Sequence, residues 1–233
     1  MIDIHSHLLY GVDDGAKTID ESVDIIRNLY KNGVTDIILT PHYIEYSSYN
    51  SNKKSNLEKL DSLKKKLKEE GININLYLGN EIYINNNILS LLKKGEISSL
   101  NDSKYLLIEL PMSGKYDNYV EIFKELIENG YKVILAHPER YNTFKKDINL
   151  IYELKNIGVL MQCNIESILK TYGKDAYKTI KKLAKNKLIN FIASDIHHKK
   201  DYEYINKARN KFKKYYSDSE INDLLSNNQK DIL

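Results

Sequence analysis

Cysteine is nearly absent, since Cys163 is the only one among the 233 residues. A single thiol cannot form a disulfide within the chain, and this fits a protein of a reducing compartment. It also argues against a metal site built from thiolates. We expect Cys163 to be a buried residue in the wall of the fold, because an isolated cysteine packs as a small apolar side chain.

Long apolar runs are missing as well. No stretch approaches the roughly 18 residues needed to cross a bilayer, so the chain is not expected to be embedded in a membrane. Met1 to His5 already has the pattern of a strand, which leaves no room for a signal peptide before it. A cytoplasmic location is therefore expected.

Neither sign of charge predominates. Lys and Arg number 35 against 32 Asp and Glu, which gives a formal net charge of +3. This balance offers no basis for a nucleic-acid partner, which requires a basic patch or stripe. The run Lys64–Lys66 has acidic neighbours on both sides and is typical of a solvated helix face.

Seven short runs rich in Ile, Leu and Val recur along the chain, with starts 27 to 39 residues apart. Such runs suit parallel strands that are buried on both faces, and the spacing suits βα units. We expect a single α/β domain over residues 1–233, a barrel of seven strands, with a doubly wound open sheet as the alternative. Residues 217–233 fit either a helix or a loose tail. The seven runs are Ile2–His5, Thr35–Thr40, Ile74–Gly79, Tyr105–Leu110, Lys132–Ala136, Val159–Cys163 and Ile189–Ser194.

The segments between these runs have helical patterns. Thr18 to Glu21 forms a capping-box sequence, which marks a helix start. Asp117–Asn129 carries apolar residues at helical spacing and is followed by Gly130. Further helices are expected at Glu153–Asn156, Ala176–Asn186 and Asp201–Tyr216.

Two connections resemble functional loops. Tyr43–Asn56 is polar, lacks apolar periodicity and contains Tyr43, Tyr46 and Tyr49. A loop of this length after a strand is often a lid over a site. The tyrosines either stack on a bound aromatic ring or decorate the loop, and the chain's 19 tyrosines favour decoration. Met112–Asn118 is a second, shorter candidate.

Histidine and acidic residues gather at the ends of the predicted strands, where the catalytic groups of an α/β barrel meet. Five of the six histidines lie within three residues of such an end. The pairs His5/His7 and Asp195/His197 are two residues apart, so both members of each pair share one face of a strand. The set that we expect to converge is His5, His7, Asp14, His42, Glu81, Glu109, His137, Asp195 and His197.

This mixture of imidazoles and carboxylates suits two or three divalent cations, of which Mn²⁺, Zn²⁺ and Fe fit best. Each signal alone is weak, because most His-x-His pairs are packing or surface residues. The set together is stronger. An ionised Glu109 after the apolar run Tyr105–Ile108 is costly unless it is paired or bound to a metal. His198 is expected on the opposite strand face and is left out.

Six motifs together resemble the PHP (polymerase and histidinol phosphatase) superfamily. Within it they look most like the protein-tyrosine phosphatases encoded beside capsule and exopolysaccharide genes in bacteria. The resemblance runs from residue 1 to about residue 212. The second and fifth motifs are the most specific, because other PHP branches differ there. The motifs are Asp3-Ile4-His5-Ser6-His7, Gly11-Val12-Asp13-Asp14-Gly15, Thr40-Pro41-His42, Gly79-Asn80-Glu81, His137-Pro138-Glu139-Arg140-Tyr141 and Ser194-Asp195-Ile196-His197.

The resemblance implies a distorted seven-stranded PHP barrel, with a three-metal site at the C-terminal strand ends that usually holds manganese. The nine converging residues match the metal ligands of the family without a gap. The family likeness also implies that Arg140 binds the substrate phosphate and that Arg209 is a second basic contact. The implied substrate is a phosphotyrosyl protein, namely a cognate bacterial tyrosine kinase that regulates capsule synthesis.

Metal-assisted cleavage of a phosphate ester fits these residues. Clustered divalent cations provide hydroxide at neutral pH, while Arg140 adds hydrogen bonds to the phosphoryl oxygens. A phenol has a pKa of about 10, so phosphotyrosine needs less protonation of its leaving group than phosphoserine does. Asp14, His42 or a metal-bound water are candidates for the general acid. A cysteine nucleophile is set aside, because that chemistry needs an arginine six positions after Cys163, where Leu169 stands.

Two other functions are compatible with such a site. One is a different phosphoesterase, either a small-molecule phosphatase of the histidinol-phosphate type or a metal-dependent nuclease. The small net charge weighs against the nuclease. The other is a metal-loaded module that binds a tyrosine kinase without turnover, against which the full ligand set and Arg140 weigh. Assays on phosphotyrosyl peptide, histidinol phosphate and single-stranded DNA separate these functions.

Overall fold

The computed structural model describes residues 1–113, 117–199 and 204–233. Its strands form two parallel sheets, one in the order β1-β2-β4 and one in the order β3-β5-β6-β7-β8-β9. The all-parallel pairing confirms the expected α/β architecture. The strands are β1 (Ile2–Asp3), β2 (Asp36–Leu39), β3 (His42–Tyr43), β4 (Asn75–Leu78), β5 (Glu81–Tyr83), β6 (Tyr105–Glu109), β7 (Lys132–Ala136), β8 (Leu160–Asn164) and β9 (Phe191–Ala193).

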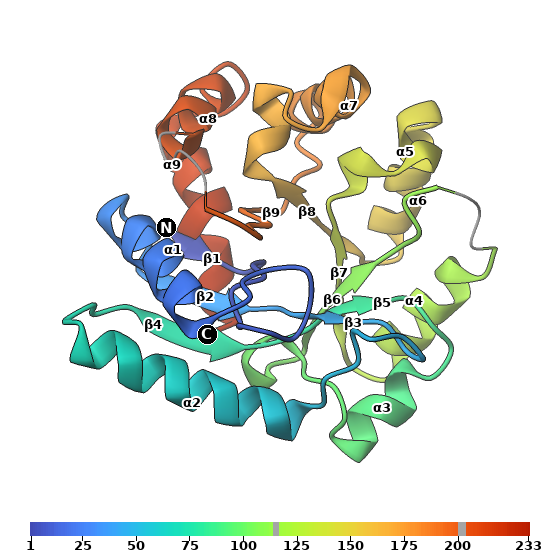
Figure 1. The fold of residues 1–233 in the computed structure, drawn as a ribbon. Helices are drawn as coiled ribbons and strands as arrows, with labels where there is room; N and C mark the ends of the chain where they lie inside the picture. The colour runs from blue at the N-terminus through green and yellow to red at the C-terminus, as the bar shows by residue number, and fades with distance from the viewer. Residues whose placement is uncertain (114–116, 200–203) are drawn as a thin grey trace.

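Helices surround these strands (Figure 1). Right-handed crossovers between parallel strands place helices on the outside in this way. No helix in the described part of the chain is long and apolar enough to cross a membrane. The helices are α1 (Ile19–Lys31), α2 (Lys53–Glu69), α3 (Ile88–Lys94), α4 (Tyr119–Glu128), α5 (Asn142–Lys146), α6 (Asn149–Asn156), α7 (Gly173–Lys185), α8 (Tyr204–Phe212) and α9 (Asp218–Asn222).

The chain passes from the first sheet to the second between β2 and β3, returns between β3 and β4, and crosses again between β4 and β5. The first passage contains Pro41, which has no N–H to donate to a neighbouring strand. A parallel bridge between Ser6 and Ile196 links the segments that follow β1 and β9, and the His7 N–H donates to the Ile196 carbonyl at 2.9 Å. The first and last strands therefore meet, although the described strands form two sheets rather than one closed sheet.

Successive residues of the strands pack into two apolar clusters. Leu107 and Ile134 belong to a smaller cluster, whereas Leu106, Ile108 and Val133 belong to a larger one. This alternation follows from the two-residue period of a strand. The smaller cluster lies among the strands and the larger one lies under the helices, which is why the strand sequences are apolar on both faces.

The predicted helices at Asp117–Asn129, Glu153–Asn156 and Ala176–Asn186 are confirmed as α4, α6 and α7, with bounds that differ by a few residues. The first helix, α1, is also present, but its capping box is incomplete. The Thr18 hydroxyl accepts the Glu21 N–H at 3.2 Å, whereas the Glu21 carboxylate accepts the N–H of Lys17 instead. Of the predicted helix Asp201–Tyr216, residues 201–203 lie outside the described residues, and α8 covers most of the remainder.

The expected loop Tyr43–Asn56 is wrong at both ends. His42 and Tyr43 form β3, and α2 begins at Lys53. The Asn52 side chain accepts the Ser55 N–H at 2.9 Å, and this cap starts the helix despite its polar first turn. Of the second expected loop, Met112–Asn118, residues 114–116 lie outside the described residues.

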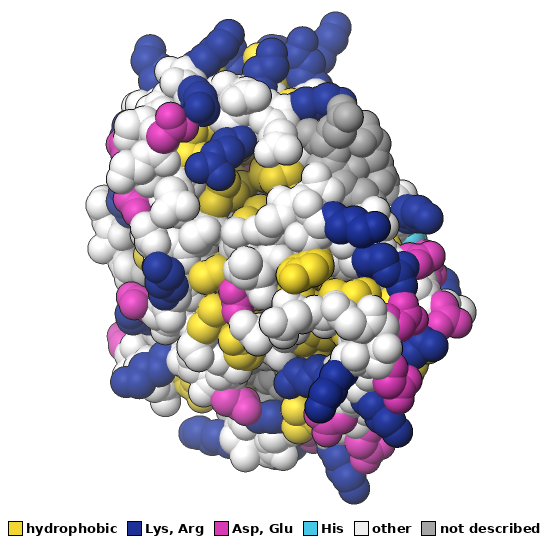
Figure 2. Space-filling view, turned by 90° about the vertical axis from the view of Figure 1, so that its left-hand side faces the viewer, with side chains coloured by type: hydrophobic (Ala, Val, Ile, Leu, Met, Phe, Trp, Pro, Cys, Tyr) yellow, Lys and Arg dark blue, Asp and Glu magenta, His cyan; other side chains and the backbone are white. Residues whose placement is uncertain are grey.

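Residues 217–233 form α9 and further helical turns. Leu224, Leu225 and Ile232 are buried, and Ile232 packs in the smaller cluster with Ile2 near the start of β1. This segment therefore covers the N-terminal ends of the strands and leaves their C-terminal ends open. On the face drawn in Figure 2, Lys and Arg side chains mix with Asp and Glu side chains toward the lower right.

Candidate metal centre

All nine residues expected to converge lie together at the C-terminal ends of the strands. His5 and His7 follow β1, whereas His42 and Glu81 follow β2 and β4 and are the first residues of the short strands β3 and β5. Glu109 is the last residue of β6. The others lie in the segments after β1, β7 and β9, namely Asp14, His137, Asp195 and His197.

The most deeply buried group consists of His5, His7, Glu81 and Asp195. The His5 Nε2 atom lies 3.3 Å from a carboxylate oxygen of Glu81 and 3.3 Å from one of Asp195. The His7 Nε2 atom lies 3.2 Å and 3.4 Å from the same two oxygens. Four donor atoms from strands far apart in the sequence thus point at one place.

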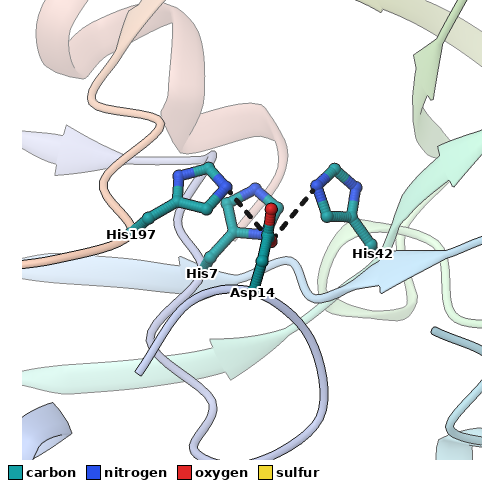
Figure 3. A group of neighbouring side chains, drawn as sticks. All are labelled: His7, Asp14, His42 and His197. Carbon is teal, nitrogen blue, oxygen red and sulfur yellow. Dashed lines mark ion pairs between the residues drawn. The ribbon is translucent and has the colours of Figure 1, made fainter. Parts of the chain in front are cut away.

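A second group lies closer to solvent and contains His7, Asp14, His42 and His197 (Figure 3). One carboxylate oxygen of Asp14 lies 3.4 Å from the His197 Nε2 atom and 3.6 Å from the His42 Nε2 atom. The His7 and His197 rings stack with centroids 3.9 Å apart. The Asp14 side chain is 48% exposed, so this group forms the open side of the centre.

Glu81 joins these groups to a third, which contains His42 and Glu109. The His42 Nδ1 atom lies 3.0 Å from Glu81 and 3.7 Å from Glu109. The His137 Nε2 atom contacts the same two carboxylates at 2.9 Å and 3.7 Å. The three groups share His7, His42 and Glu81 and thus form one continuous cluster.

These donor atoms fit divalent cations. Atoms that each lie about 2.1 Å from one ion are separated by about 3.0–3.4 Å, which is close to the spacing in the most buried group. Several buried donor atoms also lack a hydrogen-bond partner within the described part of the chain, among them Glu81 Oε2, His42 Nδ1 and Asp14 Oδ1. Buried polar atoms are normally satisfied, so unpartnered atoms that face one another indicate places for ions.

The pKa values of the clustered groups are shifted because many charged groups lie close together. Burial disfavours the imidazolium of His5, yet Glu81 and Asp195 raise its pKa to about 9. Burial and the neighbouring Glu81 raise the pKa of Glu109 to about 8. Burial also opposes ionisation of Asp195, but His5 and His7 hold its pKa far below the usual value. The protonated imidazoles thus offset the negative charge of the carboxylates, as bound cations would.

Groups behind the ligand candidates hold them in place. Asp13 accepts a hydrogen bond from His7 Nδ1 at 2.8 Å and from the backbone N–H of His42 at 3.0 Å. Gln162 Oε1 accepts from His5 Nδ1 at 2.8 Å. These contacts fix the ring tautomers so that Nε2 faces the centre, as outer partners do in metal sites.

The sequence predictions missed the roles of Asp13 and of β8, from which no ligand was expected. Gln162 and Asn164 of β8 are two residues apart and share a strand face, the same spacing that drew attention to His5 and His7. The Asn164 amide contacts Asp195 at 2.6 Å. A polar pair at period two on an otherwise apolar strand was the signal that could have found them.

Arg140, the predicted phosphate contact, lies at the edge of the centre. Its Nη1 donates to Asp195 Oδ2 at 2.7 Å, and its Cζ lies 4.5 Å from the centroid of the Tyr172 ring. The side chain is 26% exposed, so its remaining N–H groups can receive an anion. Arg209, the other predicted basic contact, lies in the last turn of α8.

Two of the nine residues have left-handed backbones. His137 has φ of 33° and Asp195 has φ of 53°. Side chains other than glycine rarely adopt such values, and backbone strain of this kind concentrates at functional sites. The strain turns both side chains out of the strand direction and into the cluster.

Comparison with known proteins gives a consistent result. The family model described as "Capsular polysaccharide synthesis, CpsB/CapC" matches residues 1–233. A putative tyrosine-protein phosphatase CapC of Staphylococcus aureus is 39% identical over 84% of this chain and 77% of its own length. The tyrosine-protein phosphatase YwqE of Bacillus subtilis is 34% identical over 86% of this chain and 78% of its own length.

Solved structures agree. A structure from work on YwqE of Bacillus subtilis and CpsB of Streptococcus pneumoniae, described as metal-dependent tyrosine phosphatases, matches with a TM-score of 0.84 and 32% identity over 94% of this chain and 89% of that one. A histidinol phosphate phosphatase of Lactococcus lactis shares the fold, with a TM-score of 0.60 and 16% identity over 91% of this chain and 93% of that one. The chain belongs to the CpsB/CapC family of capsular polysaccharide synthesis proteins.

Proposed function

We propose that this chain is a metal-dependent protein-tyrosine phosphatase of capsular polysaccharide synthesis. The observation that carries the proposal is the cluster of nine imidazoles and carboxylates with the partly exposed Arg140 beside it. Relatives named as tyrosine-protein phosphatases at 30% to 39% identity support it. We propose that residues 1–233 act as one phosphatase domain, in which the two sheets make up a distorted seven-stranded barrel.

We propose that the nine residues hold two or three divalent cations, with Mn²⁺ as the main candidate and Fe or Zn²⁺ as others. Such ions, when bound, acidify a water for attack on phosphorus and neutralise the phosphoryl oxygens. The residues of the chain itself position the substrate. Arg140, braced by Asp195, donates to the phosphate, and the substrate approaches from the exposed side at Asp14. Asp14 and His42 remain candidates for moving the proton of the leaving oxygen.

The substrate that we propose is a phosphotyrosyl protein in the cytoplasm, namely a cognate tyrosine kinase that regulates capsule synthesis. A phenolate leaves readily, since its conjugate acid has a pKa of about 10, and a metal centre of this type suits such an ester. We also keep Arg209 as a proposed second contact to substrate, although its side chain would have to reach the centre from α8.

An assay of the manganese-loaded protein on four substrates tests the proposal. We expect rapid hydrolysis of a phosphotyrosyl peptide and little or none of a phosphoseryl peptide, histidinol phosphate or single-stranded DNA. Chelation of metals should abolish the activity, whereas a thiol-alkylating reagent should not, because Cys163 is buried and uninvolved. Dominant hydrolysis of histidinol phosphate would contradict the proposed substrate.

The variant Arg140→Ala tests the proposed contact to the phosphate, and Arg27→Ala on the exposed side of α1 is its control. Removing one charged donor to the transition state costs about 2.7–4 kcal/mol, or about 100- to 1000-fold in kcat. We expect a loss of this order for Arg140→Ala with metal content unchanged. An undiminished rate would contradict the proposed role of Arg140, whereas no turnover by the unmodified metal-loaded protein would favour a module that binds a kinase without hydrolysis.

A further inference from the structure

A cavity of about 360 Å³ lies between α5 and α7 and is bordered by lysines. Figure 1 shows these two helices next to each other, and their backbones are in contact. Four of the residues that line the cavity are basic and one is acidic. They are Lys145, Lys146, Lys178, Lys182 and Asp175.

This lysine cleft, defined by Lys145, Lys146, Lys178 and Lys182, is bordered by two helices that start at the same end of the strands as the metal centre. The first helix, α5, begins two residues after Arg140. The second helix, α7, begins directly after Tyr172, whose ring lies under the Arg140 guanidinium. Both helices that border the cleft therefore start beside the place where the phosphate is proposed to bind.

The positive charge of the cleft is not neutralised locally. Lys178 pairs with Asp175 at 3.2 Å, but Lys146 and Lys182 have no ion-pair partner among residues 1–113, 117–199 and 204–233. Seven lysines and one acidic residue stand between positions 170 and 187, although basic and acidic residues are nearly balanced in the whole chain. A one-sign field of this kind attracts anionic groups and orients a charged partner.

We propose that the lysine cleft binds acidic side chains of the phosphotyrosyl protein, on one side of the phosphotyrosine. The inference rests on the proposed function. Ten residues of α7 separate Tyr172 from Lys182, which is about 15 Å at about 1.5 Å per residue. An extended peptide covers about 3.3 Å per residue, so the acidic positions fall about three to five residues from the phosphotyrosine.

Matched peptides test this inference. Three phosphotyrosyl peptides are compared. The first has Glu at positions three to five before the phosphotyrosine, and the second has Glu at positions three to five after it. The third has Gln at all of these positions. We expect the manganese-loaded protein to have a lower KM for one of the two Glu peptides than for the Gln peptide. The difference should shrink at high salt, because exposed charges are screened.

The double variant Lys178→Gln/Lys182→Gln should raise KM for the preferred Glu peptide about three- to tenfold, as expected for two exposed ion pairs. Its kcat, and its KM for the Gln peptide and for p-nitrophenyl phosphate, should not change. Lys64→Gln/Lys68→Gln is the matched control. These lysines line a second cavity of about 340 Å³ on α2, near the start of β4 and thus at the opposite end of the strands.

Equal KM values for all three peptides, or equal losses on Glu and Gln peptides in the variant, would overturn the inference. Weaker binding of the variant to vesicles of anionic phospholipid, with unchanged peptide kinetics, would assign the cleft to a membrane surface and overturn it too. A protein that hydrolyses none of the phosphotyrosyl peptides would contradict the proposed function itself. Hydrolysis without any preference for Glu would contradict the lysine cleft alone.

Discussion

The guanidinium of Arg140 lies over the Tyr172 ring, with its Cζ 4.5 Å from the ring centroid, while Asp195 accepts a hydrogen bond from the same group. The ring supports the guanidinium from one side, and a cation over an aromatic face gains about 0.5–2 kcal/mol. Tyr172→Leu should therefore raise KM for a phosphotyrosyl peptide about 2- to 30-fold. Tyr172→Phe keeps the stacking and should restore the normal KM. Equal effects of Leu and Phe in steady-state kinetics would show that the ring does not position Arg140.

Asp13 is not one of the nine expected metal ligands, and it acts by positioning two residues that are. Its carboxylate accepts from His7 Nδ1, from the His42 N–H and from the Gly15 N–H. Asp13→Asn should weaken metal binding about 10- to 100-fold, as loss of an outer partner does in metal sites. Calorimetric titration with Mn²⁺ measures this, with Asp24→Asn on α1 as the control. Unchanged affinity would mean that His7 keeps its orientation without Asp13.

At the scale of elements, the loop after β1 is folded tightly against its own strand end. A Cβ added to Gly15 would lie 1.9 Å from the carbonyl oxygen of His7 and 2.6 Å from the His7 Cβ. Gly15→Ala must therefore displace His7, at a cost of about 1–3 kcal/mol in the free energy of unfolding. Both the melting temperature and the metal content should fall. Gly71→Ala is the control, because its Cβ meets open space and only its positive φ is strained. Retained metal in Gly15→Ala would contradict this reading.

The apolar strand runs were predictable because burial on both faces leaves a continuous signal in the sequence. Strands β3 and β5 were not, since each is only two or three residues long and starts with a ligand candidate, His42 or Glu81. The start of helix α2 was missed, because its first residues were assigned to the loop Tyr43–Asn56. Its apolar stripe, with Leu60, Leu63 and Leu67 buried, begins well after its polar first turn.

The convergence of the nine side chains followed from a general rule, that parallel strands deliver their C-terminal ends to one face. The supporting contacts did not follow from any rule. Gln162 meets His5, and Tyr172 meets Arg140, only because the strands and helices pack at particular distances.

For the whole molecule, protons and metal ions compete for the same centre. Folding raises the pKa of His5 from 6.5 to about 9 and that of Glu109 from 4.5 to about 8. Both groups bind protons more tightly in the folded metal-free protein than in the unfolded chain. Their stabilising effect is therefore complete below the unfolded values and is lost as pH rises through about 8 to 9. His137 opposes this trend, because burial lowers its pKa.

Metal ions replace these protons, so added Mn²⁺ should raise the melting temperature more at about pH 8 than at about pH 6. Differential scanning calorimetry of the metal-free and metal-loaded protein at both pH values measures the two increments. The Asp13→Asn variant should show a smaller increment at both. An increment that is larger at the lower pH would contradict the exchange of protons for metal.

The bridge between Ser6 and Ile196 has a consequence for how the protein is made. His5 and His7 leave the ribosome first, but Asp195 and His197, which complete their groups, follow only after most of the chain. At about 5–20 residues per second, the early histidines wait about 10 to 40 s for these partners. A metal ion can thus be captured in full only after Asp195 and His197 have been made, which places loading of the centre after the synthesis of all nine described strands.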